Sequence, residues 1–357
     1  MMRRPSTAVP TKPTRPRQAS SRVRQRGAAV LLAMLTVALV ATLSATAYWQ
    51  QWQAWAVERA QQQHAQAAWL LSGALDWTRL ILREDARASQ TDHLAEPWAV
   101  PLQEARLNTF LAAAEAQQAD RLLTEAFLSG HITDLQARLN LRNLVRGRAA
   151  QAQVSLPDQA AAARLFSALG LPEAELGRFA EQLLRTLRNL PAEGTPTDPA
   201  ARATDTAPSA ASLLPQRWEQ LEWLGLSGPT LQQLAAHATW LPEPTPLNLN
   251  TASALVIQAS VPGLDLAQAQ RLVQQRQRSH FERLEQVAQQ LGPAGLHIGA
   301  ERFAVSSRYF LLHGQLRLDD LALSETALVV REGINVRTVW RQRGSVLLTE
   351  PGAAPGQ

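Results

Sequence analysis

The longest apolar segment of the chain lies near its N-terminus. Residues 28–48 read AAVLLAMLTVALVATLSATAY, and no charged residue occurs between Gly27 and Val57. This length matches the roughly 20 residues that a helix needs to cross a hydrocarbon core about 30 Å thick. It exceeds the apolar part of an ordinary signal peptide, about 7–15 residues, and a buried core helix of this kind would need covering on every side. The pattern predicts a retained membrane-spanning helix.

Helix-favouring residues continue well beyond this segment. No proline occurs between Pro16 and Pro97, and residues 49–88 are rich in Ala, Gln, Leu and Arg, which are good helix formers. Apolar residues recur there near helical spacing. We therefore predict one helix from about residue 28 to about residue 88, roughly 90 Å long. Half of it would lie in the membrane and half would pack on a soluble domain.

The rest of the chain changes from helical to strand-like patterning. Ser155 precedes Pro157 and Asp158 and is a candidate N-cap. The C-terminal strands are expected to return to the first strand region, so that the helices between them form an insertion. In order, we predict a loop at 89–108, a strand or hairpin and a turn at 127–144, helices at 155–190, a low-complexity loop at 191–212, helices at 213–297, and strands at 302–349 separated by Gly314, Gly333 and Gly344.

The helical middle contains a weak repeat of helix, glycine turn and helix. Gly170, Gly225 and Gly263 each lie between two apolar residues and are followed by a new helical pattern. A glycine at the end of a helix readily takes the left-handed conformation that such a turn requires. The repeat predicts two small helical bundles built from helix-hairpin-helix units.

The charge of the chain is concentrated at its N-terminus. The sequence has 35 Lys+Arg against 30 Asp+Glu, a net charge of +5 and a pI of about 10.7, which by itself suggests a nucleic-acid or membrane-surface protein. Residues 1–27, however, contain eight of the cations and no acid. Without this leader the net charge would be −3, because eight positive charges are removed from +5. The basic composition therefore suggests nucleic-acid binding only for the chain that still carries the leader.

The same basic leader predicts the orientation in the membrane. By the positive-inside rule the N-terminus would lie in the cytoplasm and residues 50–357 outside it. Trp49, Trp52 and Trp55 follow the span directly. Their spacing places them on one side of a helix at the outer headgroup level, as an aromatic belt; a buried tryptophan stripe is the alternative.

No set of residues in the sequence predicts catalysis or a metal site. The absence of cysteine excludes disulfides, thiolate zinc sites and cysteine nucleophiles, and the seven histidines have no ligand spacing. Asp319 and Asp320 near Glu325 could contact calcium, but a solvated turn is the simpler interpretation because calcium takes six to eight oxygens. We expect no enzyme activity, no catalytic residue, no metal and no cofactor.

Residues 247–291 carry the strongest signal for DNA binding. They resemble the helix-hairpin-helix domain of membrane-anchored competence DNA receptors, in which a hairpin of two glycines donates backbone N–H groups to a phosphate. Here the matching triplet is Gly263-Leu264-Asp265, so a carboxylate stands where a phosphate would dock. Nucleic-acid binding is therefore disfavoured, and a DNA-uptake receptor is the alternative function. A membrane-bound hydrolase is a third alternative, for which no catalytic set is found.

The junction between leader and span is the most specific feature. Arg26-Gly27-Ala28 followed by an unbroken apolar helix resembles a type IV prepilin signal. The fifth position after Gly27 is Leu32, where most members of that family have glutamate; the K-type minor pseudopilins of type II secretion systems typically lack it. Further stretches similar to that branch are Glu96-Pro97-Trp98-Ala99, residues 130–141 (GHITDLQARLNL) and residues 244–253 (PTPLNLNTAS).

The resemblance implies a fold and a set of parts. The fold would be α+β: a long pilin-like transmembrane helix packed on a small antiparallel sheet, with a large all-α (SAM-like, helix-hairpin-helix) insertion. The parts would be a cleaved basic leader (1–27), a transmembrane helix (28–48), the N-terminal part of the pseudopilin domain (49–150), the helical insertion (151–298), the strands that complete the sheet (299–350) and a tail (351–357).

The resemblance also implies a function. A prepilin peptidase would cut between Gly27 and Ala28 and methylate the new N-terminus. The mature chain would be anchored once in the inner membrane with its bulk in the periplasm. There it would join minor pseudopilins of the I and J types and the inner-membrane assembly platform at the tip of the pseudopilus, in initiation of assembly and export of folded proteins. The contact surface would lie on residues 50–88, whose alanines Ala60, Ala65, Ala67 and Ala68 permit close approach; packing of this stripe on the chain's own sheet is the alternative.

Calcium is a second point of comparison with these relatives. They often carry an acidic calcium-binding loop ahead of the second helical unit, which corresponds here to residues 191–212. This segment has only Glu193, Asp198 and Asp205, diluted with Ala, Pro and Thr. Three scattered carboxylates do not make a calcium cage, so we expect no calcium binding in this chain.

Overall fold

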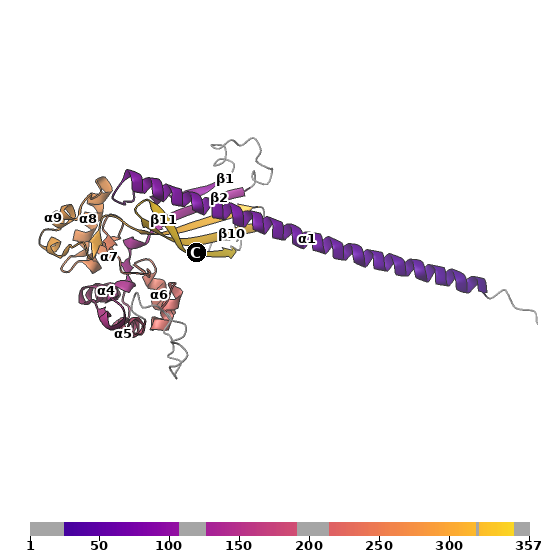
Figure 1. The fold of residues 1–357 in the computed structure, drawn as a ribbon, viewed down its shortest axis with the longest axis horizontal. Coiled ribbons are helices and arrows are strands. Elements are labelled where there is room, and N and C mark those ends of the chain that lie inside the picture. Colours follow the sequence, from indigo (N-terminus) through magenta and orange to yellow (C-terminus); the bar gives the residue numbers. More distant parts are fainter. Residues whose placement is uncertain (1–24, 107–125, 191–213, 319–320, 346–357) are drawn as a thin grey trace, which may run out of the picture. The chain divides into compact units, whose positions relative to one another are not determined.

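The computed structural model describes residues 25–106, 126–190, 214–318 and 321–345 (Figure 1). Helix α1 runs without a break over Gln25–Ala88, which confirms the single long helix expected from the sequence. Thr36, Thr42 and Thr46 in its apolar half donate their hydroxyls to carbonyl oxygens three residues earlier, so these polar groups are satisfied within the helix. The chain divides between His64 and Ala65 into two compact units, and each is described by itself.

A five-stranded antiparallel sheet lies in the second unit (Figure 1). In this sheet β2 pairs with β9: Ala126 lies opposite Leu318, and Asp134 lies opposite Phe310. The C-terminal strands therefore return to pair with the region that precedes the helices, as predicted. In spatial order the strands are β1 (Leu102–Arg106), β2 (Ala126–Asp134), β9 (Tyr309–Leu318), β10 (Leu321–Glu332) and β11 (Asn335–Ser345).

The part of α1 that belongs to the second unit packs on this sheet. Ala67 and Leu71 share an apolar cluster with Leu128 and Leu316 of the sheet. Farther along, Leu82 belongs to a second cluster with buried residues of the 3-10 helix η1 (Pro97–Ala99), of β9 and of β10. The fold is thus the predicted mixed one, a long N-terminal helix with a small antiparallel sheet.

Between β5 and β8, the described residues form six α-helices that share one apolar core, in which Phe166, Phe179 and Leu183 are fully buried. The expected glycine turns are present, since Gly170, Gly225 and Gly263 all have φ between 67° and 96°. The helices are α4 (Leu156–Ala168), α5 (Glu173–Arg188), α6 (Gly228–Leu234), α7 (Ala254–Ser260), α8 (Leu266–Arg278) and α9 (Leu284–Leu291).

Short strand pairs and 3-10 helices connect the helices to the sheet. Two pairs are parallel and one is antiparallel. The pairs are β3 (Leu139–Asn140) with β6 (Ala238–Thr239), β4 (Val145–Arg146) with β5 (Gln153–Val154), and β7 (Leu247–Asn248) with β8 (Phe303–Ala304). The 3-10 helices besides η1 are η2 (Leu135–Ala137), η3 (Leu141–Leu144), η4 (Ala149–Gln151), η6 (Glu219–Leu224) and η7 (Gly292–His297).

Two local predictions are wrong, and a third is confirmed in position. The loop expected at residues 89–108 contains strand β1, which is short and lies at a sheet edge, so its alternation is weak. Gly314 and Gly344 do not separate strands but lie inside β9 and β11, where small residues admit close neighbours. Ser155 is the N-cap of α4, as expected. Its hydroxyl makes no cap hydrogen bond and donates to Asp158 Oδ2 at 2.6 Å.

Candidate functional site

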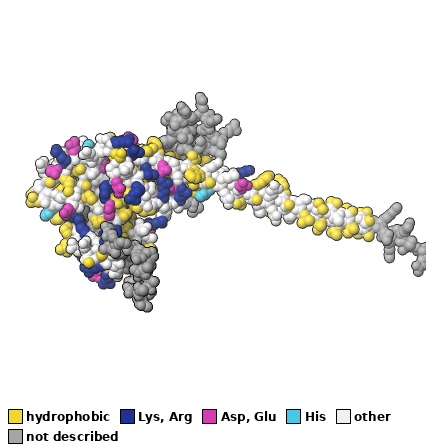
Figure 2. Space-filling view, viewed as in Figure 1, with side chains coloured by type: hydrophobic (Ala, Val, Ile, Leu, Met, Phe, Trp, Pro, Cys, Tyr) yellow, Lys and Arg dark blue, Asp and Glu magenta, His cyan; other side chains and the backbone are white. Residues whose placement is uncertain are grey.

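The first unit presents the apolar half of α1. Among the described residues, one helix is long and apolar enough to cross a membrane, and its apolar window is not buried by the rest of the chain. Figure 2 shows hydrophobic side chains along this part of α1. The predicted processing residues Gly27 and Ala28 and the assembly position Leu32 all lie on this helix and are exposed. Their processing and assembly roles remain predictions.

The three tryptophans of the predicted belt lie on the same helix. Trp49, Trp52 and Trp55 are each more than half exposed, and the ring centroids of Trp49 and Trp52 are 5.5 Å apart. Exposed tryptophan rings are favoured where one side meets apolar surroundings and the other meets water, as at a membrane interface. The belt itself remains a prediction.

In the second unit, α1 has two faces. Ala67 is buried against the sheet, whereas Ala65 is exposed, so the alanine stripe serves the chain's own sheet on one side only. Trp69 is 80% exposed, and Leu80 is about half exposed. The second face therefore carries large apolar side chains that the described part of the chain does not cover.

An apolar hollow adjoins this exposed face. A cavity of about 230 Å³ lies between α1 and the β1–β2 edge, with Ile81, Trp98 and Val100 among its lining residues. A neighbouring groove of about 390 Å³ includes Leu80 and Asp85. We name the exposed α1 residues Trp69, Trp77 and Leu80 together with this hollow the α1 groove surface.

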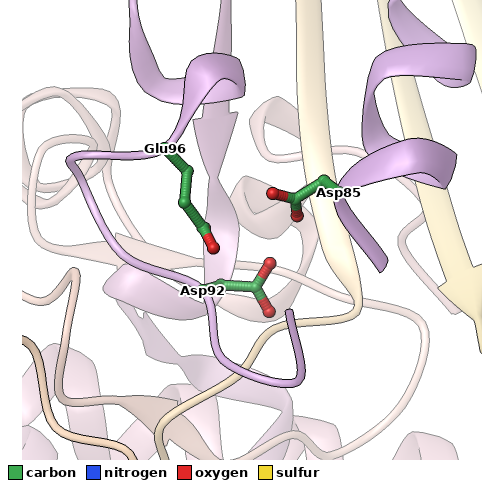
Figure 3. A group of neighbouring side chains, drawn as sticks. All are labelled: Asp85, Asp92 and Glu96. Atoms are coloured by element: carbon green, nitrogen blue, oxygen red, sulfur yellow. The ribbon is translucent and has the colours of Figure 1, made fainter. Parts of the chain in front are cut away.

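Three carboxylates converge at the end of α1. Asp85 comes from the helix, and Asp92 and Glu96 come from the loop that follows it (Figure 3). One oxygen from each lies within 4.8 Å of the others. Figure 3 shows the three carboxylates directed toward one another, an arrangement that costs free energy unless positive charge or protons compensate it.

Arg331 of β10 supplies the compensating charge for two of the three. Its Nη1 donates to Asp85 Oδ2 at 2.9 Å, and its Nη2 donates to both oxygens of Asp92 at 2.5 and 2.6 Å. Asp92 Oδ2 also accepts the backbone N–H of Ser307 at 2.7 Å. Arg331 therefore joins the end of α1, the following loop and the sheet.

Glu96 is held in a different way. Its Oε2 accepts the indole N–H of Trp98 at 2.7 Å and the backbone N–H of His93 at 2.9 Å. Its Oε1 is buried and has no hydrogen-bond partner. His93 Nε2 lies 3.7 Å from this oxygen, which is too far for a hydrogen bond.

A fourth buried carboxylate, that of Asp134, links this group to the helical part. Its Oδ2 accepts hydrogen bonds from Asn248 Nδ2, Thr251 Oγ1 and Ser307 Oγ, at 2.5 to 3.2 Å, and its Oδ1 accepts from Gln136 N. Ser307 thus contacts Asp92 through its backbone and Asp134 through its side chain. This chain of contacts connects the end of β2, the segment between β8 and β9, and the turn after β7.

Burial shifts the ionisation of these groups. It raises the pKa of Asp85 to about 6, helped by the Glu96 charge and opposed by Arg331. It raises the pKa of Asp92 against the attraction of Arg331, and raises that of Asp134 to about 6 against the hydrogen bonds from Thr251 and Ser307. Burial lowers the pKa of His93.

Sequence reasoning did not find this group. Asp85, Asp92 and Arg331 carry no motif, and Glu96 was noted only within a similar stretch. The sequence contained one weak signal for this group. Asp92 and Glu96 follow the end of the long helix and directly precede Pro97 and a tryptophan. The partner Arg331 lies 246 residues from Asp85, so no local pattern could join them.

The other candidate residues are only partly brought together. Two histidine pairs form that the sequence did not predict: His93 stacks on His280 at 3.9 Å and His131 lies 5.1 Å from His313 between ring centroids. Glu325 is buried and accepts from Arg343 at 2.7 Å. Asp319 and Asp320, and the loop acids Glu193, Asp198 and Asp205, lie outside the described residues.

The hairpin weighed for DNA binding is closed by its own aspartate. Asp265 is the N-cap of α8 and forms a capping box with Gln268, whose backbone N–H it accepts at 2.7 Å. A phosphate at this helix N-terminus would meet that carboxylate. The DNA-uptake alternative is not favoured.

Comparison with known proteins matches the same segment to another family. Residues 247–306 match the family model described as Type II secretion system (T2SS), protein K. The chain is 28% identical over 307 residues to the type II secretion system protein K of Pseudomonas aeruginosa, covering 83% of this chain and 86% of that one. The chain is thus similar to the type II secretion system protein K over most of its length. Members of this family are minor pseudopilins, which are structural components of the secretion system.

Two further comparisons give a second relative and a similar fold. The protein K of Pectobacterium carotovorum subsp. carotovorum is 26% identical over 349 residues, covering 92% of this chain and all of that one. The fold is also similar to a chain in the crystal structure of the GspK-GspI-GspJ complex from the enterotoxigenic Escherichia coli Type 2 Secretion System. That match has a TM-score of 0.54 and 18% identity, and covers 80% of this chain and 98% of that one.

Proposed function

We propose that this chain is a protein K of a type II secretion system and a non-enzymatic subunit at the tip of the pseudopilus. There it would initiate assembly and serve export of folded proteins across the outer membrane. It would be anchored once in the inner membrane, with its N-terminus in the cytoplasm and its bulk in the periplasm. The observation that carries the proposal is the construction of α1, whose first half is an uncovered apolar helix while its second half packs on the sheet.

Processing at the start of α1 fits this role. Cleavage between Gly27 and Ala28 would remove the basic leader and leave the apolar half as an anchor. A glutamate in the bilayer costs several kcal/mol unless it is paired. A subunit at the tip has no neighbouring subunit above it with which a glutamate could pair. An uncharged residue such as Leu32 at this position avoids that cost.

The α1 groove surface is the proposed contact for the I- and J-type partners. The structural neighbour was solved as a complex of three such subunits. Large exposed side chains such as Trp69 and Leu80, next to an apolar hollow, provide the rigid apolar area that stabilises interfaces.

The decisive experiment uses the host's own secretion system. Deleting the gene should abolish export of type II substrates and the formation of pseudopili, and the full-length gene should restore both. Mass spectrometry of the membrane form should find an N-terminus at Ala28 carrying one methyl group. Normal export without the gene, or an intact Met1 in the assembled protein, would reject the proposal.

A further inference from the structure

The carboxylate group at the end of α1 has too little positive charge around it. Asp85, Asp92 and Glu96 carry three formal negative charges, and Arg331 is the one guanidinium that hydrogen-bonds to them within the described residues. The formal balance of the group is therefore −2. A buried, uncompensated charge is strongly unfavourable, so the group takes up either protons or a further cation.

The unpartnered oxygen of Glu96 shows where this partner is missing. Glu96 is only 6% exposed, and its Oε1 accepts no hydrogen bond. The carboxylate faces Asp85 and Asp92 (Figure 3). Its other oxygen is fixed by Trp98 and His93, so the side chain cannot turn Oε1 away without breaking two hydrogen bonds.

The oxygens that remain free suit a hard cation. Arg331 uses Asp85 Oδ2 and both oxygens of Asp92 on its own side, which leaves Asp85 Oδ1 and Glu96 Oε1 for another partner. His93 Nδ1 accepts the N–H of Ala95, so His93 Nε2 holds the ring proton and is not a ligand. An all-oxygen set suits calcium, which accepts irregular geometry and completes its shell with water, better than zinc.

The group is also accessible from outside. Asp85 lines the groove of about 390 Å³ next to Glu84, Ala88 and Pro97. A hydrated cation could therefore reach Asp85 from this groove.

We propose that Asp85 and Glu96, through the oxygens that Arg331 leaves free, bind one divalent cation of the calcium type beside Asp92. The cation would neutralise the residual charge and join the last turns of α1 to the loop at residues 92–96. Because Arg331 and Ser307 connect these carboxylates to the sheet and to the helical part, binding would stiffen the junction between these elements. The site is separate from the acidic loop at residues 191–212 and does not depend on the proposed secretion function.

The test measures calcium binding by the full-length protein in detergent. After treatment with a chelator, calcium chloride should raise the midpoint of thermal unfolding, and calorimetry should detect one site here with a dissociation constant of about 0.1–1 mM, the range of extracellular calcium modules. Magnesium at the same concentration should give a smaller rise. No calcium response up to 10-fold above this range would overturn the proposal.

The key variant is Glu96→Gln. The amide oxygen can keep the bonds to Trp98 and His93, and the amide nitrogen then occupies the Oε1 position and donates to the neighbouring carboxylates. We expect this variant to fold, to be at least as stable as the wild type without calcium, and to lose the calcium response. A response that persists in Glu96→Gln and also in Asp85→Asn would overturn the proposal.

Two controls separate this site from others. Glu104→Gln removes an exposed carboxylate that pairs with Arg317, and should keep the full response. The triple variant Glu193→Gln, Asp198→Asn, Asp205→Asn tests the acidic loop and should also keep it. Loss of the response in the triple variant, with retention in Glu96→Gln, would assign calcium to the loop and reject the site proposed here.

Discussion

Gly130 and Gly314 stand directly opposite each other in the β2–β9 ladder. A Cβ on Gly130 would come 2.6 Å from the carbonyl oxygen of His313, and one on Gly314 would come 3.0 Å from Leu71 Cδ1 of α1. The two glycines therefore allow the strands and α1 to approach closely at this point. The close packing of α1 on the sheet therefore requires glycine, which has no side chain, at these two positions.

Substitution of Gly130 by alanine should destabilise the protein. The new methyl group meets backbone, which cannot move without shifting β9, and overpacking of this kind costs about 1–3 kcal/mol. Denaturant unfolding of the full-length protein measures the loss. Gly177→Ala in α5 is the control, because nothing lies within 4 Å of its Cβ, and helix propensity predicts a gain of about 0.5–1 kcal/mol. Equal stability of the two variants would contradict the prediction.

Removal of the Arg331 charge should be among the most damaging single changes. Arg331→Met leaves Asp85 and Asp92 buried without their cation, and breaking a buried pair in this way costs about 3–5 kcal/mol. Arg331→Lys should recover only part of this, since an ammonium lacks the planar fork that reaches both carboxylates. Arg337→Met removes an exposed pair with Glu332 and should change the free energy of unfolding little, by about 0–1 kcal/mol.

Asp134 predicts a specific pH dependence. Burial raises its pKa from 3.8 to about 6, so the folded state holds the proton more tightly than the unfolded state. The contribution to stability is therefore complete below pH 3.8 and is lost as the pH rises through about 6. Relative to Asp134→Asn, the wild type should lose on the order of 3 kcal/mol between pH 4 and pH 7.

The measurement is the free energy of unfolding of both proteins across this pH range, in the presence of a chelator. Asp134→Asn should also be less stable at every pH than a simple loss of charge implies, because its amide nitrogen would face the Gln136 N–H that Oδ1 now accepts. Parallel stability curves for the two proteins would show that Asp134 does not titrate in this window.

The α1 groove surface should be required for partner binding but not for folding. Trp69→Ser removes a large exposed side chain, so we expect unchanged thermal unfolding and at least about 10-fold weaker co-purification with the I- and J-type partners, as for a central interface aromatic. Trp223→Ser is the matched control, since Trp223 is similarly exposed but lies in η6 of the helical part. Equal capture of partners by both variants would place the interface elsewhere.

Features encoded in a short stretch of sequence were predicted well. The unbroken helix over α1 follows from the missing prolines and the apolar run, and the turns at Gly170, Gly225 and Gly263 follow from the only residue that adopts positive φ without strain. The pairing of β2 with β9 agrees with the expectation that the C-terminal strands return to the first strand region. Strand β1 was missed because an edge strand of five residues has little alternation to detect.

The sequence by itself determined the long helix with its apolar half, the order of strands and helices, and the resemblance to the K-type pseudopilins. Each of these depends on local periodicity or on a contiguous motif. Only the tertiary structure brought Arg331 to Asp85 and Asp92, and left Glu96 Oε1 without a partner among them. The physical reason is that charges distant along the chain interact strongly only when folding removes the water between them, and that removal is a property of the packed structure.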